Sequence, residues 1–521
     1  MANREELAVI RGARAGRAEF QLALGRLYLF GSAGLPRSLP TALHWLDRAA
    51  RQGCAEAWEL IGNHIPLDLA RQSPQPVRLW YERAYDNGLR RAGLVYAQLV
   101  LDTDQDASVA AERGKALRAL EDAAHAGFPE AQWLLARTHG APAAAEGGRP
   151  AATVTVPAAS PAGRRWLREA ADSGMEPAQF AQLQHDWDSG RRDAYLARAL
   201  PLARAVAGSE AAHGRAAARL APDEVLLLSR CAQLLAADPA GHEVDAAELL
   251  RFWELAAAEQ DRHAQFALGL WSARMRVDGK RIPGGGGAAN FKKAVRWLTL
   301  AGEQGLAEAW YALSRIYIKP EFSQRNVAEA QKYLERAAGM GYRDAQLECG
   351  NAAWRARREN ENNDVRALFW LQRAAAQGCP QAAAAVRKIA PRSPGAWMPL
   401  DTLLAGRDLS AHPLLAARLE LAQVFGLSRA EALLLDVHGA DRGHCLVVDI
   451  RASYGRSRRR LLPVETAQER QVLDRVRALF DAIDGGPGGP EGNYRQRLYR
   501  LRSLLPEAGA DDADPDYSLA A

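Results

Sequence analysis

An aromatic residue followed eight positions later by a glycine recurs along most of this 521-residue chain. The intact pairs are Trp45/Gly53, Trp80/Gly88, Trp166/Gly174, Trp297/Gly305, Tyr333/Gly341 and Trp370/Gly378. Three further places keep one member of the pair, namely Ala119/Gly127, Leu200/Gly208 and Trp253/Asp261. The last three glycines lie 36 and 37 residues apart. A period of this length indicates an array of helical repeats, which bury their apolar faces by stacking on one another.

The unit from Leu306 to Met340 shows the expected fold of one repeat. A first helix carries an apolar stripe, a polar loop with Pro320 ends it, and a second helix carries a second stripe. Gly341 then allows the left-handed terminus that turns the chain into the next unit. The stripes consist of Ala309, Leu313, Ile316 and Tyr317, and of Ala330, Tyr333, Leu334, Ala337 and Ala338.

Small residues at fixed places predict that neighbouring helices approach closely. An alanine stands four residues after most of the markers, as at Ala57 and Ala345, and a small residue often stands five further on, as at Gly62 and Gly350. We therefore expect the large ring of the second helix to fill the volume between layers. Burying one such ring removes ~150–250 Å² from water, which favours rings in the core over rings that stack on a ligand.

Ala42–Ala57 and Ala294–Ala309 carry the repeat pattern in its fullest form, Ala-x-x-Trp-Leu-x-x-Ala-small-x-x-Gly. This pattern resembles the Sel1-like repeat, a relative of the tetratricopeptide repeat, over about residues 18 to 390. The resemblance implies an α-solenoid of stacked two-helix repeats that holds protein partners and carries no catalytic residues. Units 128–174 and 209–261 depart from this pattern because more residues separate their successive markers.

Composition excludes several classes of protein. The formal net charge of +5 is small for this length, so it predicts no general attraction to nucleic acid. No uncharged stretch reaches the ~18 residues that span a membrane, and residues 1–17 contain no apolar run of leader length. The cysteines are scattered without a CxxC, so we expect neither disulfides nor a zinc knuckle, and a reducing cytoplasm is the default. They are Cys54, Cys231, Cys349, Cys379 and Cys445.

The repeat marks stop at about Leu400, and a small mixed α+β domain is expected beyond it. Two strands, joined through a turn at Ala452–Ser457, form a β-hairpin. The expected strands are Cys445–Ile450 and Arg460–Val464, and the expected helices are Leu414–Phe425, Gly426–Leu435, Ala467–Ile483 and Tyr494–Leu505.

This order of elements resembles the first half of a tyrosine-recombinase (phage integrase) catalytic domain over about residues 412–505. The matching segments are Leu421–Ala432, Ala440–Gly443, Gly455–Arg460, Pro463–Thr466 and Tyr494–Leu498. Such enzymes need cations around a phosphate and a tyrosine nucleophile. Here Ser428 stands where the first catalytic arginine would be, with Arg429 as its neighbour. No lysine follows Lys388, and no His-x-x-Arg block is present. The resemblance therefore implies a truncated, degenerate module without strand-exchange activity.

A dense group of arginines around the hairpin gives candidate contacts to DNA phosphates. The candidates are Arg451, Arg456, Arg458, Arg459 and Arg460. The alternative is a solvated turn flanked by Asp449 and Glu465. His438, Asp441, His444 and Cys445 are also close in sequence, but their spacing matches no familiar metal site. We expect no metal, no cofactor and no catalytic residue.

These observations predict a mostly α protein: an α-solenoid of stacked two-helix repeats followed by a small α+β domain. The predicted segments are 1–17, a solenoid at 18–390 with loop insertions near 140–163 and 279–287, a linker at 391–411, an integrase-like domain at 412–505, and an acidic disordered tail at 506–521. The predicted function is a non-catalytic adaptor in a bacterial-type cytoplasm that binds proteins on the solenoid surface. The alternative is a DNA-binding protein related to tyrosine recombinases, and no membrane contact is expected in either case.

Overall fold

The computed structural model describes residues 4–73, 77–102, 110–140, 160–213, 219–237, 245–282, 288–392, 409–450, 458–481, 483 and 488–506. Most of the predicted insertion near 140–163, the turn at Ala452–Ser457 and nearly all of the predicted tail lie outside these residues. Contacts divide the chain into two compact units, Met1–Val244 and Asp245–Ala521. Across the described ranges, no helix is both long and apolar enough to span a membrane.

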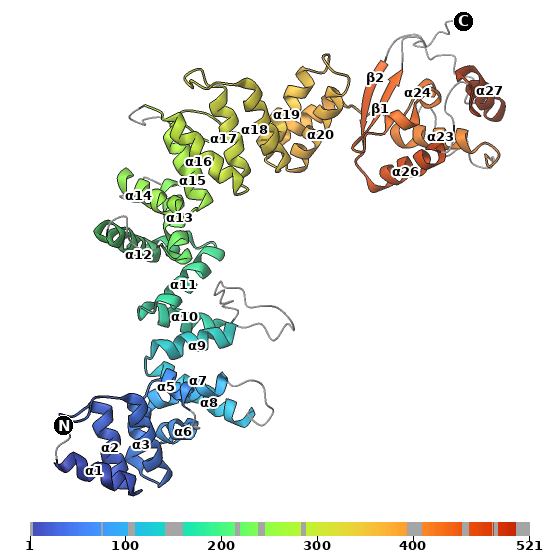
Figure 1. The fold of residues 1–521 in the computed structure, drawn as a ribbon. Coiled ribbons are helices and arrows are strands. Elements are labelled where there is room, and N and C mark those ends of the chain that lie inside the picture. Colours follow the sequence, from blue (N-terminus) through green and yellow to red (C-terminus); the bar gives the residue numbers. More distant parts are fainter. Residues whose placement is uncertain are drawn as a thin grey trace. The chain divides into compact units, whose positions relative to one another are not determined.

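The first unit consists of helices that pack against their neighbours in the sequence as a series of hairpins (Figure 1). Its helices are α1 (Arg4–Arg14), α2 (Ala18–Phe30), α3 (Leu39–Arg51), α4 (Ala55–His64), α5 (Leu67–Gln72), α6 (Arg78–Asp86), α7 (Arg90–Leu101), α8 (Ala110–His125), α9 (Pro129–Gly140), α10 (Pro161–Asp172), α11 (Glu176–Asp188), α12 (Arg192–His213) and α13 (Pro222–Ala237). The extensively packed pairs α2 with α3, α7 with α8 and α9 with α10 are the two-helix units that the sequence predicts.

The second unit begins with the same kind of helical hairpins and ends with the predicted mixed module. The hairpins are built from α14 (Ala246–Ala258), α15 (Arg262–Ala273), α16 (Phe291–Glu303), α17 (Ala307–Tyr317), α18 (Val327–Gly339), α19 (Arg343–Arg355), α20 (Asn363–Ala376) and α21 (Pro380–Ile389). The module contains α23 (Pro413–Phe425), α24 (Arg429–Leu434), α25 (Val437–Ala440), β1 (Cys445–Ile450), β2 (Arg458–Pro463), α26 (Ala467–Asp481) and α27 (Tyr494–Leu504). The two strands pair antiparallel, with Cys445 opposite Pro463 and Ile450 opposite Arg458. The predicted fold class, stacked two-helix repeats followed by helices with a β-hairpin, is confirmed.

The marker glycines follow the second helix of each hairpin and turn the chain. Gly341 has a φ of 99°, its N–H donates to the Ala338 carbonyl, and the N–H of Tyr342 donates to the Ala337 carbonyl, each at 3.0 Å. This pair of bonds is a Schellman terminus, in which glycine adopts a positive φ without steric cost. The other glycines of the intact pairs also have positive φ values: 85° at Gly53, 90° at Gly88, 86° at Gly174, 91° at Gly305 and 80° at Gly378.

These glycines form helix termini, as the sequence predicts at Gly341, and take no part in the packed layers. All six are exposed: Gly53, Gly88, Gly174, Gly305, Gly341 and Gly378. A Cβ added at any of them would meet no atom within 4 Å, so no neighbouring helix requires the side chain to be absent. Their contribution to the repeat is therefore the backbone turn alone, because only the positive φ favours glycine there.

At two helix contacts, the leucine that follows the marker aromatic packs against a glycine of the preceding helix. A Cβ added at Gly350 would lie 2.6 Å from Cγ of Leu371, and one added at Gly269 would lie 2.5 Å from Cγ of Leu298. Leu371 and Leu298 are fully buried. At these two places the expectation that the marker ring fills the space needs correction, because the leucine fills it. A ring does fill the corresponding space at Gly302, where an added Cβ would lie 2.5 Å from Cε2 of the buried Trp310.

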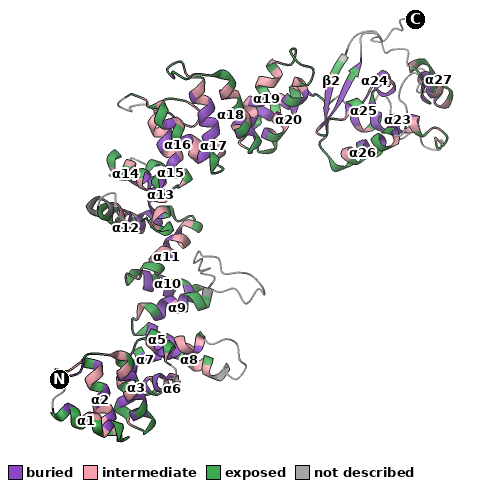
Figure 2. Cartoon of the chain, in the orientation of Figure 1, coloured by how far each residue is buried: buried purple, intermediate pink, exposed green. Residues whose placement is uncertain are grey.

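Figure 2 shows buried and exposed residues on each of the repeat helices. The predicted repeat aromatics divide into two groups by burial. Trp80 and Trp166 are buried, with exposed fractions of 5% and 6%. Four rings are only half-buried, so part of each remains accessible to solvent; these are Trp45, Trp297, Tyr333 and Trp370.

Two of the altered markers differ from the sequence interpretation. Gly208 lies inside α12, and its φ is not positive, so no helix ends there and the Leu200/Gly208 marker was wrong. At Trp253/Asp261 the positive φ moves to Gln260, at 66°. Asp261 instead caps α15, because its carboxylate accepts a hydrogen bond from the Ala264 N–H at 2.7 Å. An aspartate can therefore replace the marker glycine when the preceding residue makes the turn.

Candidate functional site

The hairpin arginines that the sequence offers as phosphate contacts are only partly described. Arg451 and Arg456 lie outside the described residues, and Arg458 is placed in β2 without a described side chain. Arg459 and Arg460 are the members whose side-chain contacts can be followed.

Arg459 binds the last helical hairpin of the repeat region. Its Nε lies 2.8 Å from Oδ2 of Asp364 in α20, and its Nη2 donates to the Glu361 carbonyl at 2.7 Å. Its Nη1 donates to Oδ2 of Asp449 on the paired strand at 3.0 Å. The hydrogen bonds to Asp364, ahead of those to Asp449, raise the pKa of this guanidinium. Its charge is therefore balanced within the protein.

Arg460 neutralises a buried carboxylate in the module. Its Nε and Nη2 contact the two oxygens of Glu431 at 2.7 and 2.6 Å, and Glu431 is 1% exposed. The same carboxylate accepts the backbone N–H of Ser428 at 2.8 Å and completes a capping box on α24. Any phosphate that bound Arg459 or Arg460 would compete with these carboxylates, so phosphate contact by the hairpin stays a prediction.

One face of the hairpin packs on the last helices of the repeat region. Cys445, Val447 and Leu461 share a buried cluster with Leu368, Leu371 and Val386 of α20 and α21. Polar contacts also join the repeat region to the module. His444 Nε2 lies 3.0 Å from the Val365 carbonyl, and Arg392 contacts Glu469 at 2.7 Å. The hairpin thus covers the apolar surface that another helical hairpin would cover.

The four residues that lie close in sequence contact different partners in the structure. These residues are His438, Asp441, His444 and Cys445. His438 pairs with Asp481 at 3.0 Å, whereas Asp441 accepts hydrogen bonds from Arg470. Burial lowers the pKa of His444 and raises the pKa of the Cys445 thiol to about 12. Over the ranges that the structure describes, no set of three His, Cys, Asp or Glu side chains is arranged to hold a metal ion.

A buried glutamine network joins adjacent repeats, and the sequence reasoning missed it. Gln346 is 2% exposed, donates through Nε2 to the Ala338 carbonyl at 3.1 Å, and accepts at Oε1 from Gln377 of the next hairpin at 2.8 Å. Gln265 with Gln304, and Gln21 with Gln52, repeat this arrangement at 2.8 and 2.7 Å. Each buried glutamine stands four residues before the glycine of the helix contact, which is the spacing that could have revealed it.

A cavity of about 280 Å³ lies in the first unit, where α11, α12 and α13 meet. Its apolar wall includes Phe180, Leu183 and Leu226, and Leu226 is 37% exposed. Arg230 lines it too, donates to Oε1 of Gln184 at 2.7 Å and lies 4.6 Å from the ring centroid of Trp187. The described lining therefore combines exposed apolar surface with the oriented cation of Arg230 and the carboxylate of Asp223.

Stacked helical hairpins joined by glycine turns define the chain as an α-helical repeat protein of the α-solenoid class. Five segments match the Sel1 repeat: residues 17–54, 156–175, 262–306, 307–342 and 360–379. These five segments are therefore similar to Sel1 repeats. All matched segments precede residue 380, so the resemblance of residues 412–505 to tyrosine recombinases gains nothing from them and stays a prediction.

The chain is also similar to two solved structures. One is c5321, a protective antigen present in uropathogenic Escherichia coli strains that displays an SLR fold, with 19% identity, coverage of 100% of this chain and 99% of that chain, and a TM-score of 0.44. The other is a Sel1 repeat protein from Oxalobacter formigenes, with 19% identity, coverage of 74% and 90%, and a TM-score of 0.26. Both TM-scores lie below 0.5, so the fold described above depends on this chain's own contacts. No curated protein sequence matches the chain significantly.

Proposed function

We propose that this protein is a non-catalytic adaptor of a bacterial-type cytoplasm, which binds a protein partner on the first helices of its Sel1 repeats. The observation that supports this function most directly is the cavity between α11 and α13. Repeat proteins use such surfaces for recognition, because the stacking residues fix the backbone while the exposed residues are free to vary.

The partner enters this cavity with an apolar side chain. Phe180 and Leu226 flank the opening, and Leu226 already exposes apolar surface that gains from being covered. Arg230 is held between Gln184 and Trp187, so its guanidinium is oriented before any partner arrives. A preorganised anchor of this kind loses little conformational entropy on binding.

Two leucine substitutions test the proposal with a matched control. Leu226 and Leu79 are both exposed leucines of the first unit, but Leu79 belongs to α6 and does not line the cavity. We expect partners captured by the full chain from a bacterial lysate, and identified by mass spectrometry, to lose at least tenfold in affinity with Leu226→Glu.

The same partners should bind Leu79→Glu as they bind the unmodified chain. The proposed surface is wrong if both variants retain the partners equally. The adaptor function itself is wrong if the folded chain retains no protein at all.

A further inference from the structure

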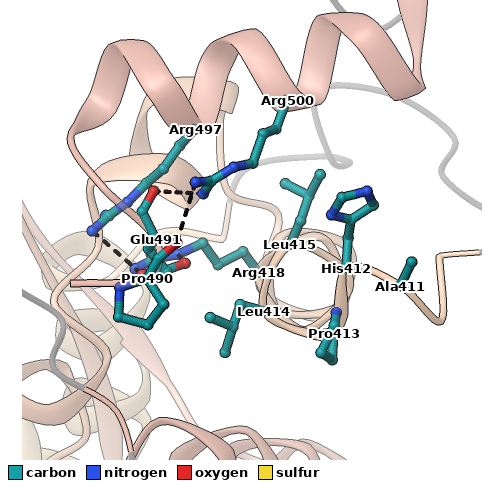
Figure 3. Close-up of a pocket in the computed structure, with 10 residues that line it drawn as sticks. All are labelled: Ala411, His412, Pro413, Leu414, Leu415, Arg418, Pro490, Glu491, Arg497 and Arg500. Carbon is teal, nitrogen blue, oxygen red and sulfur yellow. Dashed lines mark hydrogen bonds and ion pairs between the residues drawn. The ribbon is translucent and has the colours of Figure 1, made fainter.

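A second cavity, of about 250 Å³, lies wholly within the C-terminal module and has an unbalanced charge (Figure 3). Three arginines line it, Arg418 from α23 and Arg497 and Arg500 from α27, whereas Glu491 supplies the one carboxylate among the lining residues that the structure describes. The wall therefore carries a net charge of +2 from these four side chains.

Two of the arginines bind the carboxylate of Glu491. Arg418 binds both of its carboxylate oxygens at 2.7 Å, and Arg497 contacts Oε2 at 3.3 Å. The side chains of Arg418 and Glu491 are each 4% exposed, so this ion pair is a fixed part of the wall.

Arg500 is the arginine that remains available to a ligand. Its Nη1 donates to the Glu491 carbonyl at 2.6 Å and its Nη2 to the Pro490 carbonyl at 3.2 Å. A guanidinium has five N–H groups, so three are left after these two bonds. Among the residues that the structure describes, no carboxylate forms an ion pair with Arg500.

The first turn of α23 adds further positive potential at the same place. Residues 411–415 line the cavity, and the N-cap residue His412 makes no side-chain cap hydrogen bond. The N–H groups in the first turn of a helix have no acceptor within the helix, and the helix dipole favours an anion there.

The neighbouring cavity provides an internal comparison. It has a volume of about 200 Å³, shares Arg418 and Arg497, and includes the carboxylate of Asp436. Each described lining thus contains one carboxylate, Asp436 or Glu491, but only the cavity beside Arg500 adds a third arginine to Arg418 and Arg497.

We propose that the cavity beside Arg500 binds a small aliphatic carboxylate. Arg500 receives the carboxylate, because a guanidinium fork matches two carboxylate oxygens. Ala411, Pro413, Leu414 and Leu415 surround the aliphatic body. The cavity volume of about 250 Å³ has room for a small ligand of roughly eight non-hydrogen atoms.

Hexanoate has this size and serves as the probe. Saturation-transfer NMR on the full chain should show saturable binding of hexanoate with a dissociation constant on the order of 1 mM, an ordinary affinity for so small a ligand. Arg500→Gln should weaken binding about tenfold, since it removes a charge-assisted contact. Arg495→Gln is the matched control, because Arg495 is exposed on the same helix and does not line the cavity.

A second variant tests the apolar part of the site. Ala411 is exposed, so Ala411→Trp can fill the cavity without disturbing the core, and it should abolish hexanoate binding.

Equal binding of 1-hexanol would overturn the proposal, because the carboxylate would then contribute nothing. Displacement of hexanoate by an equal concentration of inorganic phosphate would overturn it too, because the aliphatic body would then be irrelevant. Absence of saturable binding, or equal affinity in the Arg500→Gln and Arg495→Gln variants, would also refute it.

Discussion

At the scale of single residues, contacts between repeats depend on where a side chain is missing. Gly350 lies within α19, where glycine is less favourable than alanine by ~1 kcal/mol. It nevertheless occupies this position because Leu371 of the next helix fills the space that a methyl group would need. Close packing therefore outweighs helix propensity at this contact.

Gly350→Ala should destabilise the α19–α20 hairpin by about 1–3 kcal/mol, because the new methyl group would overlap Leu371 and approach the Ala367 carbonyl at 3.2 Å. Gly339→Ala is the matched control. Gly339 ends α18 with no atom within 4 Å of the added Cβ, so the substitution should be neutral or stabilising by up to ~1 kcal/mol. Hydrogen exchange of peptides from α18 to α20 measures both effects, and equal protection in the two variants would contradict the argument.

Gln346→Ala should cost about 1–3 kcal/mol, because it leaves the buried Ala338 carbonyl without its side-chain donor and breaks the bond to Gln377. Gln331→Ala removes a bond that Gln331 makes to Glu335 within its own half-buried helix face, so a loss of about 0.5 kcal/mol or less is expected there. Chemical denaturation followed by hydrogen exchange in α19 compares the two. A similar cost for both would mean that the glutamine network adds nothing between repeats.

At the scale of elements, the β-hairpin joins the module to the repeats. The sequence predicts both strands, because Cys445–Ile450 and the segment near Arg460 are rich in β-branched or aliphatic residues. It does not predict what the hairpin packs on, because Asp364 and Arg459 are 95 residues apart. The sequence left open whether these arginines contact phosphate or form a solvated turn flanked by Asp449 and Glu465. Arg459 pairs with Asp449 on the neighbouring strand, and nothing in the sequence indicates its contact with α20.

Ionisation of Asp441 makes the stability of the module depend on pH. Hydrogen bonds from Arg470, which outweigh the opposing effect of burial, lower the pKa of this carboxyl group. Because the pKa of Asp441 is lower in the folded state than its ordinary value of about 3.9, the ionised carboxylate stabilises the fold at any pH above that value. This contribution is lost as the pH falls through the folded-state pKa. Asp441→Asn should therefore cost about 2 kcal/mol at pH 7, and the difference from the unmodified chain should shrink below about pH 4.

Urea denaturation from pH 3 to pH 7, followed by hydrogen exchange in α26, measures this difference. Asp474→Asn is the control, because Asp474 also binds Arg470 but its side chain is 65% exposed. A difference for Asp441→Asn that stayed constant with pH would contradict the assigned cause.

At the scale of the whole molecule, each compact unit needs its apolar ends covered. In the second unit, the hairpin residues Cys445, Val447 and Leu461 cover α20 and α21, and all three are at most 5% exposed. The module is therefore a terminal cap of a repeat array as well as a domain with its own core.

Removing the module should destabilise the last hairpins more than the earlier ones. A fragment of residues 245–392 would expose the surface around Leu368, Leu371 and Val386, and each buried aliphatic side chain contributes ~1.5–3 kcal/mol. We expect α19 to α21 to lose protection against hydrogen exchange relative to residues 245–521, while α15 and α16 change little. Equal protection along both fragments would show that the repeats need no cap.

The sequence by itself determined the repeat, the helical hairpins and the glycine turns, because each depends on residues less than one repeat apart. It also located the strands and helices of the module. Tertiary structure alone decided that Leu298 and Leu371, rather than the tryptophans before them, pack against Gly269 and Gly350. It also decided that the marker glycines stay exposed, that buried glutamines join adjacent repeats, and that Arg459 and Arg460 contact carboxylates. The physical reason is that packing, desolvation and ion pairing depend on which groups meet in space, and those groups lie as far as 95 residues apart in the chain.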